Sequence, residues 1–170
     1  MIDLKKADLS EVALIERLGK KSYQEHFGHL WSEKGLENYL NSHFSEQALI
    51  AQLKTPYIRY YIPYYNQSPA GILKVKFHRE IPAPPMDFGL ELEKIYLLDE
   101  FTGKGIGNFI MENAKGIAAQ NGESFLWLDV LKTNHRAKKM YETQGFKIVN
   151  EIKFSTDIQE IGMWIMRLNL

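Results

Sequence analysis

Three glycines at alternate positions, Gly103, Gly105 and Gly107, separate a strand-like segment from a helix-like one. Residues 90–98 before them predict a strand, and the apolar residues after them recur at helical spacing. Each such glycine costs about 0.5 to 1 kcal/mol of ordering entropy relative to alanine, so three together indicate a turn or a close ligand that needs them. A strand, a bare turn and a helix predict an anion site, because the first amides of a helix lack partners and its dipole favours negative charge.

The spacing of the glycines argues against two familiar phosphate-binding motifs. A P-loop carries lysine and then serine or threonine after its last glycine, whereas Asn108 and Phe109 follow Gly107 here. A dinucleotide-binding loop has its third glycine where this chain has Asn108, and it opens a βαβ unit that the upstream sequence does not offer. A nucleotide-dependent oxidoreductase is therefore disfavoured.

The other segments predict alternating strands and helices. Before the glycines we expect a strand in residues 1–8, helices starting near Glu11, after Ser32 and after Ser45, a hairpin of residues 57–65 and 70–77, and a proline-rich surface loop at residues 79–89. After the glycines we expect a helix that ends at Asn121 and Gly122, a strand at 124–131, a helix at 134–144 and strands at 146–154 and 162–170. This order indicates one domain, residues 1–170, of class α+β or α/β, with three layers and a mixed sheet.

The predicted strand before the glycines has an irregular apolar pattern. Leu90 and Leu92 have one parity, whereas Ile95 and Leu97 have the other, so regular alternation cannot place them all on one face. An extra residue near Glu93 or Lys94, which is a β-bulge, would resolve the conflict, and bulges gather beside active sites. A central strand covered on both faces explains the pattern about as well.

Composition limits the classes of partner. The 170 residues carry 21 Lys and Arg against 21 Asp and Glu, so no net field attracts nucleic acid or an anionic membrane. No stretch reaches the roughly 18 apolar residues of a membrane span, and the N-terminus lacks the apolar core of a signal peptide, so we expect a cytoplasmic protein. There is no cysteine, and only His26 and His29 of the five histidines are close in sequence, so we expect no metal site.

Two motifs resemble those of the GNAT superfamily of acetyl-CoA-dependent N-acetyltransferases. The loop TGKGIG, residues 102–107, is similar to the pyrophosphate loop of that family, although Thr102 stands where the family has glutamine or arginine. Residues 134–146, NHRAKKMYETQGF, match its pattern of Asn, Ala, Tyr, Gly and Phe without a mismatch. The resemblance implies a three-layer fold with a mixed, mostly antiparallel central sheet, splayed central strands and helices on both faces.

The resemblance also implies a site for acetyl-CoA as co-substrate. Backbone amides of the glycine loop would bind the pyrophosphate, and the strand before it and the helix after residue 133 would hold the pantetheine. These predicted cofactor-binding residues are Ile95, Leu97, Gly103, Lys104, Gly105, Ile106, Gly107, Asn108 and Asn134. Asn134 is also a good N-cap for the helix that it precedes, and both roles are compatible.

Tyr141 and a carboxylate are the catalytic residues that the resemblance implies. Tyr141 would protonate the departing thiolate, because the pKa values of a thiol and a phenol are close enough for exchange. The acceptor amine is mostly protonated at neutral pH, so a base is expected nearby. Glu93 at the suspected bulge is the candidate base, directly or through water, and Glu91 is its rival. The alternatives are a core aromatic for Tyr141 and solvated strand carboxylates for the two glutamates.

Three segments look most like those of polyamine acetyltransferases of the PaiA type, namely SYQEHF at residues 22–27, NYLNSHFSEQAL at 38–49 and LELEKIYLLDEFTGKGIG at 90–107. The resemblance implies a small-molecule amine such as spermidine or spermine as acceptor. Carboxylates and aromatic rings would form its cationic pocket, namely Glu25, Glu33, Glu37, Tyr23, Phe27, Trp31 and Tyr39. The alternatives are an amine on a protein or peptide, and a CoA-binding regulatory domain without activity. A homodimer is expected because exposed end strands of such sheets are often paired.

Overall fold

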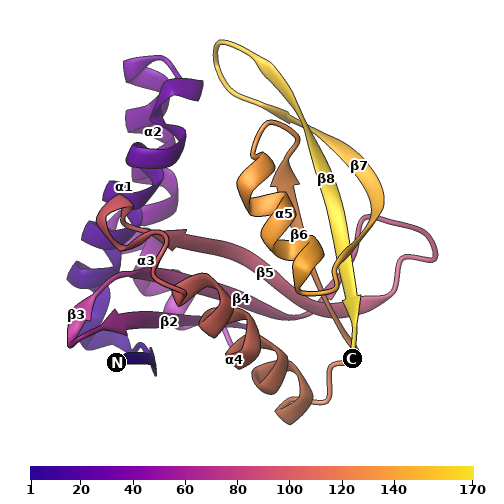
Figure 1. Cartoon of the computed structure of the whole chain (residues 1–170). Helices are drawn as coiled ribbons and strands as arrows, with labels where there is room; N and C mark the ends of the chain where they lie inside the picture. Colours follow the sequence, from indigo (N-terminus) through magenta and orange to yellow (C-terminus); the bar gives the residue numbers. More distant parts are fainter.

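The computed structural model describes residues 1–170 and contains one sheet of eight strands (Figure 1). The strands lie in the order β1-β2-β4-β5-β6-β8-β7, and the short β3 pairs with β2. Their bounds are β1 Ile2–Lys6, β2 Ile58–Tyr65, β3 Ser68–Pro69, β4 Gly71–Glu80, β5 Phe88–Leu97, β6 Phe125–Leu131, β7 Lys147–Ser155 and β8 Glu160–Asn169. Every neighbouring pair is antiparallel except β5 with β6. The expected mixed, mostly antiparallel sheet is confirmed.

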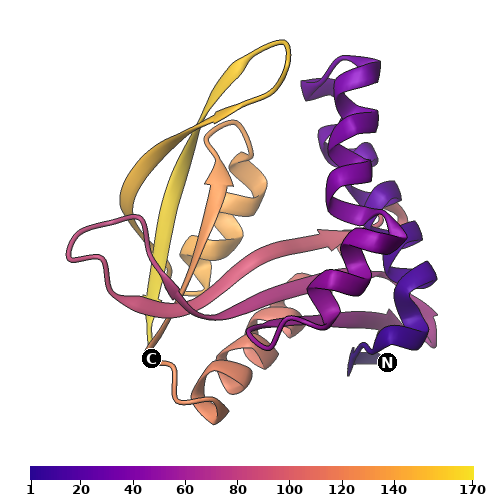
Figure 2. The same ribbon diagram turned by 180° about the vertical axis from the view of Figure 1, so that it is seen from behind.

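Helices cover both faces of this sheet. They are α1 Val12–Phe27, α2 Glu33–Phe44, α3 Glu46–Leu53, α4 Ile106–Gln120 and α5 His135–Thr143, with short 3-10 turns at Leu9–Glu11, Gly28–Leu30 and Asp99–Phe101. Helices α1 to α3 lie on one face, in front in Figure 2, and α4 and α5 lie on the other, in front in Figure 1. The three-layer arrangement is confirmed. None of the helices has both the length and the apolar character that crossing a membrane requires.

The predicted caps begin the N-terminal helices. The hydroxyls of Ser32 and Ser45 accept hydrogen bonds from amides in the first turns of α2 and α3. Asp8 caps the 3-10 turn that leads into α1, and Glu11 completes a capping box by accepting from the Asp8 amide. Local sequence signals therefore fix where these helices start.

Successive residues of β2 show how the two cores are filled. Tyr61 packs in the core beneath α4, which also contains Ile110. Tyr60 and Ile62 point the other way, into the core beneath α1 to α3. Both Tyr60 and Ile62 are fully buried, so this strand is covered on its two faces as an inner strand of a three-layer domain must be.

Strand β5 contains the β-bulge that its sequence suggested. Lys74 of β4 pairs with Lys94, and the next residue of β4 pairs with Leu92, so Glu93 is the extra residue. The bulge lets Leu92 and Ile95 both contact the core beneath α4 despite their opposite parity. It also changes the direction of the backbone at the residue predicted to be catalytic.

Strands β5 and β6 remain paired over only two positions, which end at Glu91 and Trp127. Beyond them β5 stays hydrogen-bonded to β4 as far as Leu97, while β6 stays with β8 as far as Leu131. The two halves of the sheet therefore diverge, and Figure 1 shows β6 to β8 rising steeply from the line of β2, β4 and β5. The expected splay of the central strands is confirmed.

The proline-rich loop differs from its prediction. It is confined to residues 81–87, because β4 continues to Glu80 and β5 begins at Phe88. Ile81 and Ala83 are 0% and 2% exposed, since they pack with Phe125 and Trp127. The prediction of a surface loop is wrong at these positions, because the loop covers the face of β6 that α5 leaves open.

The turn between β7 and β8 is tied to the start of α2. Asp157 accepts hydrogen bonds from the amide and the hydroxyl of Ser32, although 125 positions separate the two residues. Gln159 donates its side-chain amide to the carbonyl of Leu30 at 3.1 Å. These contacts join the turn between the last two strands to the segment between α1 and α2.

Candidate active site

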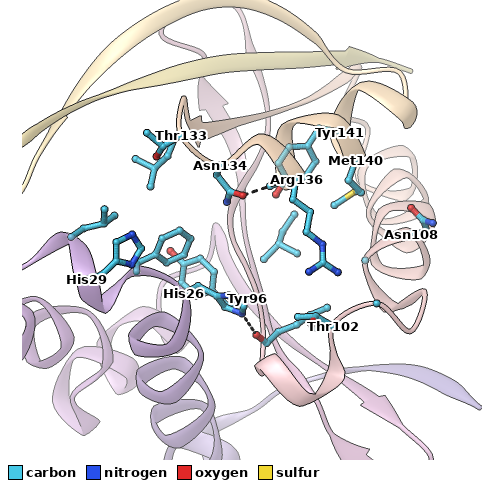
Figure 3. A pocket seen from close by; sticks show the side chains of 18 of the residues that line it. His26, His29, Tyr96, Thr102, Asn108, Thr133, Asn134, Arg136, Met140 and Tyr141 are labelled. Carbon is cyan, nitrogen blue, oxygen red and sulfur yellow. Dashed lines mark hydrogen bonds between the residues drawn. The ribbon is translucent and has the colours of Figure 1, made fainter.

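A cavity of about 490 Å³ lies where β5 and β6 diverge, and we call it the loop cavity (Figure 3). Its walls come from β5, the glycine turn, the end of α1 and the first turns of α5. Eight predicted site residues line it: Ile95, Leu97, Gly103, Gly105, Gly107, Asn108, Asn134 and Tyr141. Of the others, Lys104 has its ammonium 5.6 Å from the ring centre of Tyr65, and Ile106 is 1% exposed in the core.

The glycine turn presents free amides to the loop cavity. Gly103 and Gly105 have φ values of +74° and +79°, a conformation that favours glycine. A Cβ at Gly105 would meet no atom within 4 Å, so the requirement there is conformational. The amides of residues 103–108 donate to no carbonyl of the protein, and the last three open α4. A turn of this kind is a ready anion site.

Arg136 faces the same turn from α5. Its Nη2 would lie 3.7 Å from a Cβ at Gly103, and Figure 3 shows the side chain extended into the cavity. It belongs to none of the ion pairs of the structure. The sequence pattern led to Thr102 as the side-chain position, but the Thr102 hydroxyl donates to the Asp99 carbonyl at 2.8 Å. Arg136, a basic residue in the first turn of the helix that follows Asn134, was not among the predicted site residues.

The backbone of β5 also has groups free for a ligand. Leu98 donates its amide to the carbonyl of Ala70 at 2.8 Å, so alternation along the strand directs the backbone groups of Ile95 and Leu97 away from β4. The Leu97 carbonyl accepts from Nε2 of His26 at 2.7 Å (Figure 3). The amide of Leu97 and both backbone groups of Ile95 therefore face the gap.

Asn134 and Tyr141 stand on the opposite wall. The Asn134 side chain accepts from the Ala137 amide at 3.3 Å, which confirms its predicted N-cap role. Tyr141 is 8% exposed and reaches the cavity from the second half of α5. Burial raises the pKa of the Tyr141 phenol above its ordinary value, so the phenol is protonated at neutral pH and can donate a proton.

A second cavity of about 300 Å³, which we call the inner cavity, adjoins the first and reaches α2. Seven residues line both: Phe27, Ile95, Tyr96, Leu131, Asn134, Ala137 and Tyr141. The inner cavity also contains two carboxylates, Glu93 and Asp129, and one ammonium, that of Lys94. Tyr141 thus lies between a chamber with free amides and a chamber with acidic groups.

The predicted aromatic residues of an acceptor pocket largely meet at the inner cavity. Tyr23, Phe27 and Tyr39 line it, and the rings of Tyr23 and Tyr39 stack with centroids 4.4 Å apart. Trp31 does not line it, but its indole nitrogen donates to the Tyr23 hydroxyl at 3.0 Å and fixes that ring. These rings form an apolar wall opposite β5.

The three predicted acidic residues of that pocket do not reach it. Glu25 accepts from the Asp99 amide at 2.7 Å, and Glu37 pairs with Lys34 at 3.4 Å on the outer side of α2. Glu33 is exposed in the first turn of the same helix. The prediction fails for them because α1 and α2 turn their aromatic faces inward and their acidic faces to solvent.

Glu93 is surrounded by lysines. Its Oε2 lies 2.7 Å from Nζ of Lys74 and 3.2 Å from Nζ of Lys76, and its Oε1 lies 3.9 Å from Nζ of Lys94. Burial acts to raise the pKa of Glu93, but Lys94, Lys74 and Lys76 together outweigh it and lower the pKa to about 2. The carboxylate is therefore engaged with cations, and its role as base stays a prediction.

Other titratable groups nearby are shifted mainly by burial. Glu91 lines neither cavity, and burial raises its pKa to about 7. Burial lowers the pKa of Lys94 to about 8. Burial also lowers the pKa of His43, and the positive charge of Lys94 lowers it further, to about 4. His43 is consequently neutral at pH 7. Asp129, a lone acid in an otherwise apolar strand, was not singled out by the sequence pattern.

Comparison with known families agrees with this geometry. Residues 18–146 match the model of the Acetyltransferase (GNAT) family. The chain belongs to the GNAT family. The matched range contains β5, the glycine turn and all of α5, and the family suggested by the two motifs is confirmed.

Relatives and solved structures support this GNAT assignment. An uncharacterized N-acetyltransferase from the pepI 3′ region of Lactobacillus delbrueckii subsp. lactis is 27% identical over 154 residues, which are 91% of this chain and 87% of the relative. An uncharacterized N-acetyltransferase of Mycobacterium tuberculosis is 39% identical over 62 residues, 36% of this chain and 40% of the relative. The crystal structure of PaiA N-acetyltransferase from Thermoplasma acidophilum in complex with coenzyme A has the same fold, with a TM-score of 0.80, 19% identity and coverage of 100% and 99% of the two chains.

The lysine cluster around Glu93 predicts a pH-dependent stability difference between the wild type and Glu93→Gln. The folded pKa of about 2 lies below the ordinary value of 4.5, so the ion pairs stabilise the fold above pH 4.5 and lose this effect as the pH falls toward 2. At neutral pH we expect the variant to be less stable by up to about 3 kcal/mol. Urea unfolding at a series of pH values measures this, and a difference that persists undiminished at pH 2 would contradict it.

Proposed function

We propose that this GNAT protein transfers the acetyl group of acetyl-CoA to a small primary amine. The observation that carries the proposal is that the loop cavity and the inner cavity meet at Tyr141. One chamber offers unpaired amides to an anionic co-substrate, and the other offers aromatic rings and carboxylates to a cationic acceptor. The two reactants can therefore approach one acid from opposite sides.

The loop cavity suits the pyrophosphate and the pantetheine of acetyl-CoA. The free amides of residues 103–108 and the guanidinium of Arg136 supply donors and positive charge, and the dipole of α4 adds about 0.3 to 1 kcal/mol. The backbone groups of Ile95 and the amide of Leu97 would bind the pantetheine amides as one strand binds the edge of another. Bound acetyl-CoA supplies a thioester whose carbonyl carbon an amine can attack. The PaiA protein of the same fold is in complex with coenzyme A, and we propose the same ligand here.

Tyr141 is the proposed acid for the leaving sulfur. Its phenol is buried between the two chambers, and burial raises its pKa. The same surroundings raise the pKa of a thiol, because both ionised forms are anions that lose solvation, so the two groups stay matched for exchange. A domain that only binds CoA has no need of a phenol where the two cavities meet. The position of Tyr141 therefore favours an enzyme over a regulatory domain.

A polyamine such as spermidine or spermine is the proposed acceptor. Tyr23, Phe27 and Tyr39 offer rings to methylene groups and ammonium groups, and Asp129 offers a carboxylate that belongs to no ion pair of the protein. The ammonium of Lys94 is 3% exposed and lies beside Glu93, so it is partly compensated. A chain of methylenes with amines at intervals suits a cavity of about 300 Å³ with this lining.

The test is release of free thiol from acetyl-CoA in the presence of spermidine, spermine, lysine and peptides with free N-termini. We expect turnover with the polyamines and little with the peptides, since the inner cavity has a volume of about 300 Å³. Turnover with peptides alone would show that the acceptor is an amine of a protein or peptide and not a polyamine. No turnover with any amine, despite binding of acetyl-CoA measured by calorimetry, would establish a silent CoA-binding domain.

The glycine turn predicts that Gly105→Val abolishes acetyl-CoA binding. Valine disfavours the φ of +79°, and the change should raise the dissociation constant by roughly 100-fold or more because the amides lose their common orientation. Thr102→Ala is the matched control in the same turn. We expect its dissociation constant to stay near the wild-type value, since the hydroxyl serves the Asp99 carbonyl. Calorimetry with acetyl-CoA distinguishes the two, and equal loss in both variants would contradict binding through amides.

The position of Tyr141 predicts a selective effect of Tyr141→Phe. Removing the hydroxyl should lower kcat by roughly 10²-fold, because the thiolate loses its proton donor, while affinity for acetyl-CoA changes little. The rate of thiol release and the dissociation constant are measured on the same preparation. An unchanged rate would remove Tyr141 from the mechanism.

A further inference from the structure

The two carboxylates of the inner cavity have opposite surroundings. Glu93 has three lysine ammonium groups within 4.0 Å. Asp129 belongs to no ion pair, and no hydrogen bond contributes to its environment. Of the two acids that can meet an acceptor, only Asp129 is free to take a proton without displacing a cation.

Asp129 lies at the point where the sheet opens. Trp127 forms the last pair between β6 and β5, and Asp129 is the next residue on the same face of β6. Its neighbour in the β8 ladder is Ile165, which is fully buried and apolar. The Asp129 side chain lines the inner cavity together with Ile95 and Tyr141. Solvent reaches the carboxylate through this cavity, although protein surrounds it on its other sides. The carboxylate therefore faces the place where an amine would meet the thioester.

We propose that Asp129, and not Glu93, is the catalytic base that takes the proton from the acceptor ammonium, a proposal that rests on the proposed acetyl transfer. Glu93 then acts as a positioning residue, since its ion pairs join the bulge of β5 to β4 through Lys74 and Lys76.

The charges around Asp129 suit this role. The titratable groups that face it or share its cavity come from five elements: Glu91, Glu93, Lys94 and Tyr96 of β5, Lys76 of β4, Tyr141 of α5, Tyr23 of α1, and Tyr39 and His43 of α2. Burial is the largest effect and raises the pKa of Asp129 to about 6, with Lys94 and Lys76 opposing it and Glu93 adding to it. A base with a pKa near the working pH is more effective than one near 2, because it is both ionised and able to hold a proton.

The proton balance closes with these two residues. Asp129 accepts one proton from the ammonium, which frees the nitrogen lone pair to form the C–N bond at the thioester carbon. As the C–S bond breaks, Tyr141 gives its proton to the sulfur, and the second proton lost by the nitrogen restores the phenol. Asp129 then releases its proton to solvent, so one proton leaves for each amide formed.

The experiment compares the pH dependence of kcat/KM in the wild type, Asp129→Asn and Glu93→Gln, with the amine of the panel that the wild type acetylates fastest. In Asp129→Asn we expect kcat/KM near neutral pH to fall by roughly 10² to 10³-fold. The deficit should shrink as the pH rises, because the fraction of free amine grows about tenfold per unit below a pKa near 10.4. The dissociation constant of acetyl-CoA should stay at the wild-type value, which also shows that the variant is folded.

Glu93→Gln separates the two acids. The wild type should lose kcat/KM as the pH falls through about 6, and Glu93→Gln should keep this acid limb with a lower midpoint, because the charge that raises the pKa of Asp129 is gone. Wild-type kcat/KM in Asp129→Asn would overturn the proposal, as would an acid limb that vanishes in Glu93→Gln and persists in Asp129→Asn. A wild type that acetylates no amine would overturn the proposed function and this base with it, whereas the other outcomes leave the proposed function standing.

Discussion

The parting of β5 from β6 after two paired positions is the constraint on which the rest of the site depends. Each strand keeps its other neighbour, so the cost is confined to one row of backbone groups that lose a partner strand. Those unpaired groups face the space between the strands, and this space is the meeting point of the two cavities. The glycine turn follows from the same geometry, since β5 must leave the sheet and enter α4 beside the opening.

A bulge keeps the opening in place. Glu93 is inserted into β5 opposite a regular strand, and its carboxylate is bound by lysines of β4 and by the next residue of its own strand. Such a cluster costs desolvation and contributes little net stability compared with apolar packing, but breaking it leaves buried cations without a partner. We infer that the main effect of the cluster is to hold the bulged backbone of β5 in one conformation beside the gap.

Much of this was readable from the sequence because the signals were local. Ser32 and Ser45 indicated helix starts, the glycine spacing indicated the turn, and the parity change after Leu92 suggested a bulge beside the alternative of a strand covered on both faces. What the sequence could not supply was side-chain direction across elements. Glu25, Glu33 and Glu37 looked suitable for a cationic pocket but point outward, whereas Arg136 and Asp129 look ordinary in the sequence and reach the cavities only because α5 and β6 face the gap.

The hydrogen bonds from Asp157 to Ser32 and from Gln159 to Leu30 bear on the order in which the molecule is built. Contacts between such distant parts of a chain require closure of a long loop and form late in folding. While the chain is still emerging from the ribosome, α1 to α3 can pack before the β7–β8 turn that faces them exists. Phe154 and Met163, the parts of the inner cavity wall that lie on either side of this turn, are thus added last to a newly made molecule.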